Sequence, residues 1–104
     1  MWILETTERS EAGPFTFRLM PGAIKTIGRS TTADFIVDAG MVSRFHCRLT
    51  ATEQGNIEIQ DLESTNGTFV NDRRVDRGVV GIGDRIRIGR VELLVKDADK
   101  VNGQ

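Results

Sequence analysis

The chain has 104 residues, which is enough for one domain with a hydrophobic core that needs no disulfides. Fourteen lysines and arginines stand against fifteen acidic residues, so the net charge of −1 argues against nonspecific binding to nucleic acid or to anionic membranes. The single cysteine excludes an internal disulfide, and the apolar stretch Met1–Leu4 is too short for a signal peptide or a membrane span. We therefore expect an intracellular protein, cytoplasmic or, in a eukaryotic host, nuclear, with no direct nucleic-acid partner and no membrane partner.

Short apolar runs, separated by turn residues about every eight to twelve positions, predict β-strands along the whole chain. Ile57 and Ile59 alternate with Glu58 and Gln60, which is typical of a strand with one face on a core and one in water. No window of about a dozen residues sustains the helical period of 3.6. In chain order, the expected strands are Trp2–Glu5, Phe15–Leu19, Ala23–Gly28, Phe35–Val37, His46–Thr50, Asn56–Asp61, Thr68–Val70, Asp84–Ile88 and Val91–Val95. This pattern predicts an all-β protein, an antiparallel sandwich or barrel.

The expected domain covers residues 1–96. Residues 97–104 are polar and are expected to form a linker or a frayed end. Within the domain, residues 29–43 and 62–67 are less regular than the strands around them. Loops on a rigid sandwich commonly carry binding residues, so these two segments are the candidates for a functional site.

The residue types argue against catalysis and against a metal centre. The only histidine and the only cysteine, His46 and Cys47, are neighbours, and neighbouring side chains on a strand point to opposite faces. One histidine and one cysteine are too few for a metal site, and Asp34 and Asp38 are isolated carboxylates outside any calcium-loop spacing. No phosphate-binding glycine loop or dinucleotide fingerprint occurs. We expect no enzyme activity, no metal, no cofactor and no small-molecule substrate.

The irregular segments instead carry hydrogen-bond donors. These donors are Arg29, Ser43, Arg44, Thr65 and Asn66. An arginine fork pairs with two oxygens of a phosphate monoester, and hydroxyl and amide groups fill the remaining lone pairs. The set therefore suits a phosphorylated side chain. Spacing alone does not bring the segments together, and exposed charges with a simple Asn-Gly turn remain the alternative.

Three short motifs resemble the forkhead-associated (FHA) domain in order and spacing. They are Gly28–Ser30, Ser43–His46 and Ser64–Thr68, with seventeen residues between His46 and Ser64, and Gly83–Gly89 is similar to the start of that family's closing strand. The resemblance covers residues 15–95. It implies an antiparallel β-sandwich of about eleven strands, of the FHA/SMAD type, with binding loops at one end. It also implies phosphothreonine-dependent peptide binding that mediates phosphorylation-regulated protein–protein interaction.

The resemblance further implies a role for each residue that matches the family. Arg29 and Ser43 match the positions that hold the phosphate, with Arg44 as an auxiliary basic contact, Thr65 as the completing hydroxyl and Asn66 as the carboxamide that grips the peptide main chain. The expected partner is a protein or peptide that contains phosphothreonine.

Gly28, His46 and Gly67 match positions that support the site structurally, with the His46 ring bracing the loops. Phe45 departs from the pattern, because a basic residue is common there. The alternative function is a sandwich without phosphate selectivity that acts as a structural or self-association element through a face or an edge strand.

Overall fold

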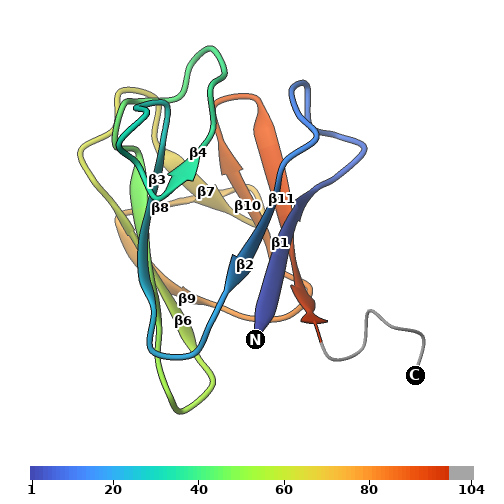
Figure 1. The fold of residues 1–104 in the computed structure, drawn as a ribbon. Helices are drawn as coiled ribbons and strands as arrows, with labels where there is room; N and C mark the ends of the chain where they lie inside the picture. The colour runs from blue at the N-terminus through green and yellow to red at the C-terminus, as the bar shows by residue number, and fades with distance from the viewer. Residues whose placement is uncertain (99–104) are drawn as a thin grey trace.

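The structure is a computed structural model that describes residues 1–98, and in that range it contains eleven strands and no α-helix (Figure 1). The strands are β1 (Trp2–Thr6), β2 (Thr16–Leu19), β3 (Ile24–Gly28), β4 (Phe35–Ile36), β5 (Cys47–Ala51), β6 (Ile57–Asp61), β7 (Thr68–Val70), β8 (Arg73–Val75), β9 (Arg77–Val80), β10 (Arg85–Ile88) and β11 (Val91–Asp97). The expected all-β fold and the implied strand number are confirmed.

The strands form two sheets that face each other as a sandwich (Figure 1). The six-stranded sheet has the order β2-β1-β11-β10-β7-β8, and the five-stranded sheet has the order β4-β3-β5-β6-β9. The strand pairs are antiparallel as expected except β3 with β4, which pair in parallel. A parallel pair cannot be closed by a tight hairpin, so the chain makes a longer connection after Gly28 before it returns as β4.

The sequence analysis missed β8 and β9. Both are short strands at the edge of a sheet, and each pairs with a single neighbour. Their residues are mostly charged or exposed, because an edge strand needs no continuous apolar face. The other expected strands match the observed bounds to within two residues. Strand β11 extends through Asp97, which had been expected to begin the tail, and residues 99–104 lie outside the described part of the chain.

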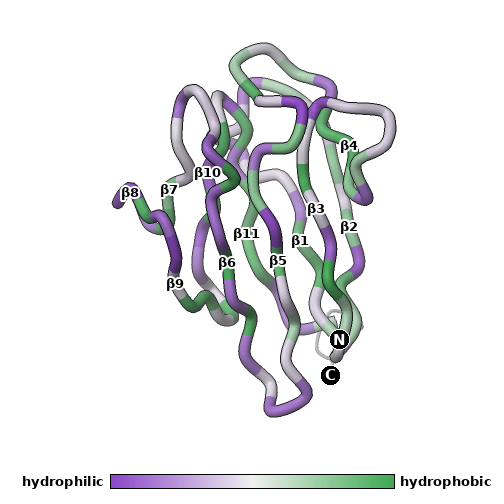
Figure 2. The backbone as a smooth tube through the Cα atoms, turned by 90° about the vertical axis from the view of Figure 1, so that its left-hand side faces the viewer, coloured by the Kyte–Doolittle hydropathy of each residue, from purple (hydrophilic) through white to green (hydrophobic). Residues whose placement is uncertain are grey.

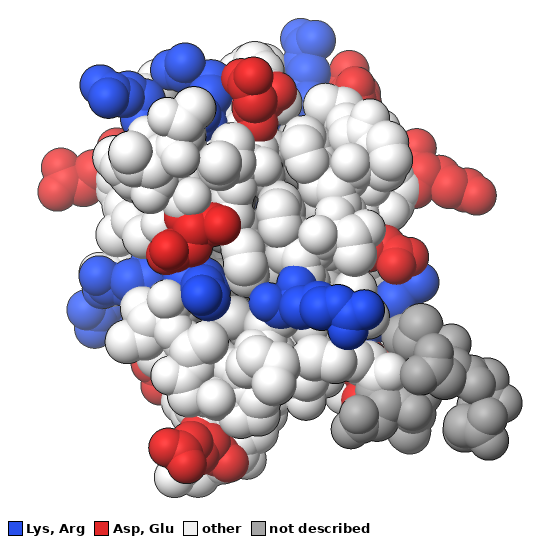
Figure 3. All heavy atoms as spheres, in the orientation of Figure 1, with Lys and Arg blue, Asp and Glu red and all other residues white. Residues whose placement is uncertain are grey.

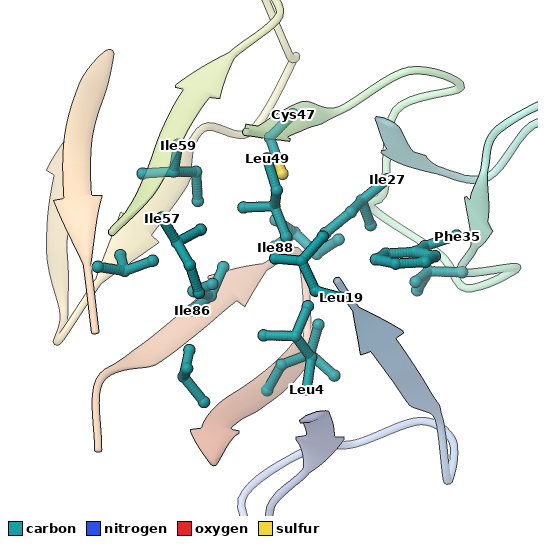
Figure 4. Packing of buried hydrophobic residues seen from close by; sticks show 14 of the residues in the cluster. Leu4, Leu19, Ile27, Phe35, Cys47, Leu49, Ile57, Ile59, Ile86 and Ile88 are labelled. Atoms are coloured by element: carbon teal, nitrogen blue, oxygen red, sulfur yellow. The ribbon is translucent and has the colours of Figure 1, made fainter. Parts of the chain in front are cut away.

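The core lies between the sheets and is built from the inward-facing residues of both (Figure 4). Hydrophilic and hydrophobic residues alternate along β6, as Figure 2 shows, and its isoleucines Ile57 and Ile59 are buried. Other large side chains that are fully buried in this core are Leu4, Leu19, Ile27, Leu49, Ile86, Ile88 and Leu93. Trp2 also belongs to this cluster. The alternation therefore fixes which face of each strand is inside.

Five connections gather at one end of the sandwich, the upper end in Figure 1. They are the β1–β2, β3–β4, β4–β5, β6–β7 and β10–β11 connections, and the candidate site residues lie in or next to the β3–β4, β4–β5 and β6–β7 connections. The β9–β10 connection and the N-terminus lie at the opposite end (Figure 1). Within residues 1–98, no helix is long and apolar enough to cross a membrane.

Candidate functional site

Gly28 ends β3 where the backbone of the β4–β5 connection comes closest. A Cβ atom at Gly28 would overlap the Arg44 carbonyl and would lie 2.9 Å from the Phe45 Cα atom. This close approach lets the Arg29 amide donate to the Ser43 carbonyl at 2.9 Å and the Ser30 amide donate to the Arg44 carbonyl at 3.0 Å. The absence of a side chain at Gly28 therefore allows Arg29 to lie beside Ser43, fourteen residues later in the chain.

The Arg29 side chain is exposed, and one of its three nitrogens is anchored. Its Nε donates to the Val42 carbonyl at 3.1 Å. Within the described part of the chain, neither terminal nitrogen makes a hydrogen bond or an ion pair. The guanidinium is thus oriented through Nε, and its two outer nitrogens remain available as a fork for an anion.

Ser43 links the β4–β5 connection to the β6–β7 connection. Its Oγ accepts a hydrogen bond from the Thr65 amide at 3.0 Å, which leaves the hydroxyl hydrogen available for a ligand. Next to this pair, the Asn66 Nδ2 donates to the Met41 carbonyl at 3.0 Å. The three segments that the sequence could not place together are therefore joined by direct hydrogen bonds.

These residues surround an open depression of about 380 Å³. It is lined by Arg29, Met41, Val42, Ser43, Thr65 and Asn66. Basic and acidic side chains are interspersed at this end of the molecule (Figure 3). A larger depression of about 470 Å³ lies over β5, β6 and β9, and it contains none of the predicted site residues.

His46 is fully buried, and its ring contacts both the β4–β5 connection and the β6–β7 connection. Its Nδ1 accepts from the Ser43 amide at 3.0 Å, so its Nε2 carries the proton and donates to the Gly67 carbonyl at 2.8 Å. Burial lowers the pKa of His46, and the Gly67 hydrogen bond and the charge of Asp61 oppose this only in part. The ring therefore braces the loops as a neutral group.

Asp61, at the end of β6, organises the β6–β7 connection. Its Oδ1 accepts from the Ser64 hydroxyl at 2.6 Å and from the Thr68 hydroxyl at 2.7 Å, while its Oδ2 accepts from the Ser64 amide at 3.1 Å. Partial burial acts to raise the pKa of Asp61, but these hydrogen bonds and nearby His46 lower it below its ordinary value. The Ser64 hydroxyl in turn accepts from the Gly67 amide at 2.9 Å.

Gly67 completes the same turn in a backbone conformation that favours glycine, with φ of +89°. A Cβ atom there would lie 2.8 Å from the Arg74 Nε, because the Arg74 side chain crosses over Gly67. Gly67 therefore lies next to the predicted site residues, where its carbonyl accepts from His46 and its amide donates to Ser64.

Two residues near the site lie outside the depression. Arg44 is exposed and does not line it, although Arg44 directly follows Ser43. Phe45 is 41% exposed, an unusual position for an aromatic ring.

Burial raises the pKa of the nearby Cys47 thiol to about 12, so this cysteine is an unreactive core residue. Among residues 1–98, no group of three or more potential metal-binding side chains occurs.

The sequence reasoning missed three residues that shape the site: Met41, Val42 and Asp61. Met41 and Val42 contribute their backbone carbonyls, which carry no sequence signal. Asp61 was treated as the last residue of a strand, although an aspartate three residues before a serine is a recognisable turn pattern.

Comparison with known proteins gives consistent matches. The family model described as "FHA domain" matches residues 25–89. The chain is 41% identical over 85 residues to the ABC transporter ATP-binding/permease protein Rv1747 of Mycobacterium tuberculosis, covering 82% of this chain and 10% of that protein. It is 36% identical over 76 residues to the glycogen accumulation regulator GarA of the same organism, covering 73% of this chain and 46% of GarA. The crystal structure of the FhaA FHA domain complexed with the intracellular domain of Rv3910 superposes with a TM-score of 0.79 at 33% identity, covering 92% of this chain and 100% of that one.

The fold and these matches identify the domain as a phosphothreonine-dependent binding module, and such modules mediate phosphorylation-regulated protein–protein interaction. The chain belongs to the FHA family. It spans less than half the length of each of the two curated relatives named above.

Proposed function

We propose that the depression binds the phosphate of a phosphothreonine and that the neighbouring carboxamide holds the peptide. Arg29 and Ser43 contact the phosphate directly, and the Thr65 hydroxyl completes the set of donors. Arg44 adds positive charge from outside the depression, and Asn66 donates to the peptide main chain.

The observation that carries this proposal is the arrangement of Arg29, Ser43 and Thr65. The Arg29 guanidinium is anchored by Nε and offers two further nitrogens, while Ser43 Oγ is held by the Thr65 amide and keeps its own hydrogen to donate. A phosphate monoester carries about −1.5 to −2 charges at neutral pH, so one or two arginines nearly neutralise it. Charge-assisted bonds of this kind are about twice as strong as neutral ones.

The Asn66 carboxamide has a second hydrogen on Nδ2 besides the one given to Met41. That hydrogen and the Asn66 carbonyl oxygen are the groups proposed to pair with the main chain of a bound peptide. Main-chain recognition fixes the peptide next to the phosphate without depending on its side chains.

The partner under this proposal is another protein that carries a phosphorylated threonine, and the module acts by binding without catalysis. We place it inside the cell, where kinases with access to ATP phosphorylate proteins. The larger protein to which the domain belongs then sets which process depends on the interaction.

The test is calorimetric titration with three peptides of one sequence that carry phosphothreonine, phosphoserine or unmodified threonine. We expect binding of the phosphothreonine peptide and no measurable binding of the unmodified one. Equal binding of these two would support the alternative, a sandwich that binds without phosphate selectivity.

The same titration predicts a preference for phosphothreonine over phosphoserine of about ten-fold. Both peptides carry the same charge, so the difference comes from the threonine γ-methyl, which is worth about 0.8 kcal/mol when buried, and from the stiffer threonine side chain. Met41 and Val42 are the apolar residues that line the depression. Equal affinities would indicate an electrostatic patch without a shaped slot for the methyl group.

A further inference from the structure

The segment Met41–Ser43 holds the binding side chains of the proposed site. The Met41 carbonyl accepts from Asn66 Nδ2, and the Val42 carbonyl accepts from Arg29 Nε. Ser43 accepts the Thr65 amide through its Oγ. The position of this segment therefore sets where Arg29, Thr65 and Asn66 lie.

Met41 itself sits in an unfavourable backbone conformation. Its φ is 69°, a value that residues other than glycine, asparagine and aspartate adopt rarely. Met41 is 49% exposed, so burial of this residue does little to hold it in place. Backbone conformations of this kind persist only where the surrounding structure enforces them.

Gly89, in the β10–β11 turn of the opposite sheet, lies close to the Met41 backbone. A Cβ atom added at Gly89 would lie 2.9 Å from the Met41 carbonyl oxygen, 3.0 Å from the Met41 carbonyl carbon and 3.2 Å from the Gly40 oxygen. All three contacts are to backbone, which cannot move aside as a flexible side chain can. The two backbones are thus in direct contact only because residue 89 has no side chain.

We propose that Gly89 is a positioning residue of the phosphopeptide site, acting through the Met41 carbonyl on Asn66. The close approach of the β10–β11 turn fixes the Met41 carbonyl, and that carbonyl fixes the Asn66 carboxamide that faces the ligand. Gly89 contacts no ligand itself. The inference rests on the proposed role of Asn66 in peptide binding.

The experiment compares Gly89→Ala with Gly83→Ala. Gly83 also has a positive φ, +92°, but a Cβ atom there would meet nothing within 4 Å. It lies in the β9–β10 connection, at the end of the sandwich opposite the depression (Figure 1). Both substitutions strain the backbone, and only Gly89→Ala displaces the Met41 carbonyl. Gly83→Ala is therefore a matched control for the general loss of stability.

We expect Gly89→Ala to weaken binding of the phosphothreonine peptide about ten-fold, the effect of losing one well-placed hydrogen bond. Gly83→Ala should bind within about two-fold of the wild type. Titrations are made well below the unfolding temperature of both variants. In NMR spectra of the free proteins, the Asn66 side-chain amide signals should shift in Gly89→Ala and stay in place in Gly83→Ala.

The route through Asn66 is tested by combining Gly89→Ala with Asn66→Ala. If Gly89 acts through Asn66, the double variant should bind no more than about two-fold more weakly than Asn66→Ala alone. A full additional ten-fold loss would overturn this route. Wild-type affinity of Gly89→Ala, or equal losses in the two glycine variants, would overturn the positioning role.

Two further measurements decide the outcome if the wild type does not bind or if Gly89→Ala does not fold. If the wild type does not bind the phosphothreonine peptide, the proposed function fails, while the Asn66 amide signals still decide whether Gly89 positions that side chain. If Gly89→Ala does not fold, Gly89→Asn replaces it, because asparagine tolerates a left-handed φ but brings the same Cβ atom against Met41.

Discussion

Arg29 is the residue on which the charge of the proposed site depends most. It lies inside the depression, it is held by two hydrogen bonds to the β4–β5 connection, and its outer nitrogens have no partner in the described part of the chain. Arg44 offers the same charge from an exposed position outside the depression. Orientation, and not charge alone, therefore separates the expected contributions of the two arginines.

Replacing Arg29 with alanine should weaken phosphothreonine-peptide binding by about 2–4 kcal/mol, because a charged phosphate would lose its closest partner. Arg29→Lys should restore only part of this loss, since an ammonium group cannot pair with two oxygens at once. Titration calorimetry measures both, with Arg44→Ala as the control and a smaller expected loss. Wild-type affinity of Arg29→Ala would show that the phosphate binds elsewhere.

His46 is the only histidine in the chain, so its titration can be followed without interference from another imidazole. Its two ring nitrogens make hydrogen bonds that require one protonated and one unprotonated nitrogen. A protonated ring would lose the bond from the Ser43 amide and would place a charge in a buried position. The folded protein therefore favours neutral His46.

This preference predicts a stability that falls as the pH is lowered. Because burial lowers the pKa of His46 below 6.5, the unfolded chain takes up a proton first as the pH falls below that value. The free energy of unfolding should then fall by at most about 1.4 kcal/mol per pH unit, until the folded protein is protonated as well. The pKa of Asp61 is also lowered in the folded protein, but its effect on the free energy of unfolding appears only as the pH falls below about 3.8, the ordinary value for aspartate.

Denaturant unfolding of the free protein at pH 7.5 and 5.5 measures this effect, with His46→Gln as the control that lacks the titrating group. We expect the pH dependence in this window to be present in the wild type and absent in the variant. The same slope in both proteins would show that another group is responsible.

At the scale of the element, the β6–β7 connection depends on a carboxylate, Asp61, that does not line the depression. Asp61 accepts three hydrogen bonds from Ser64 and Thr68, which close the turn that presents Thr65 and Asn66. Of the two neighbouring hydroxyls of Ser64 and Thr65, that of Ser64 is engaged with Asp61 and Gly67. The Ser64 hydroxyl therefore shapes the turn, and the Thr65 hydroxyl is available for the ligand.

Asp61→Asn should lower both stability and binding, because an amide nitrogen replaces one of the two accepting oxygens. The expected cost is about 1–3 kcal/mol in the free energy of unfolding, the range for leaving a buried polar group unpaired. The control is Asp84→Asn, since Asp84 similarly accepts from the Gly81 amide and from Asn71 at the other end of the sandwich. Thermal melts and peptide titrations should show a loss of stability in both variants and a loss of binding only in Asp61→Asn.

At the scale of the whole molecule, the proposed site spans both sheets. The β3–β4 and β4–β5 connections belong to the five-stranded sheet, while the β6–β7 connection crosses to the six-stranded sheet. The β10–β11 turn of the six-stranded sheet closely approaches the Met41 backbone at Gly89. Unfolding of either sheet would therefore separate the residues of the site. Because the ligand then binds only the folded protein, its binding raises the free energy of unfolding.

A phosphothreonine peptide should raise the unfolding temperature of the domain. At a concentration of about 100 times its Kd it contributes about 2.7 kcal/mol, and each 1 kcal/mol corresponds to roughly 4–8 °C for a domain of up to about 100 residues. The transition can be followed by the fluorescence of Trp2, the only tryptophan, which is buried in the core and becomes exposed on unfolding. The unphosphorylated peptide is the control, and an equal shift with both peptides would contradict phosphate-dependent binding.

Most of the strands could be predicted because their residues alternate between the core and the solvent. The period-two pattern of β6 and β10 reports directly on burial, and Asn66-Gly67 marks a turn by its backbone preference. Strands β8 and β9 carry no such pattern, because they are short and most of their residues are charged or exposed. Their position was decided by pairing with β7 and β6.

The sequence by itself determined the strand periodicity, the turn residues and the chemical types that make a phosphate-binding site plausible. Those properties are local, since each depends on a residue and its near neighbours along the chain. The meeting of Arg29, Ser43 and Thr65 was decided by the tertiary structure, because the close approach at Gly28 and the His46 ring join segments far apart in the sequence. The carbonyls of Met41 and Val42 likewise became partners of Asn66 and Arg29 only through folding, because every residue has a carbonyl and only position selects which one is used.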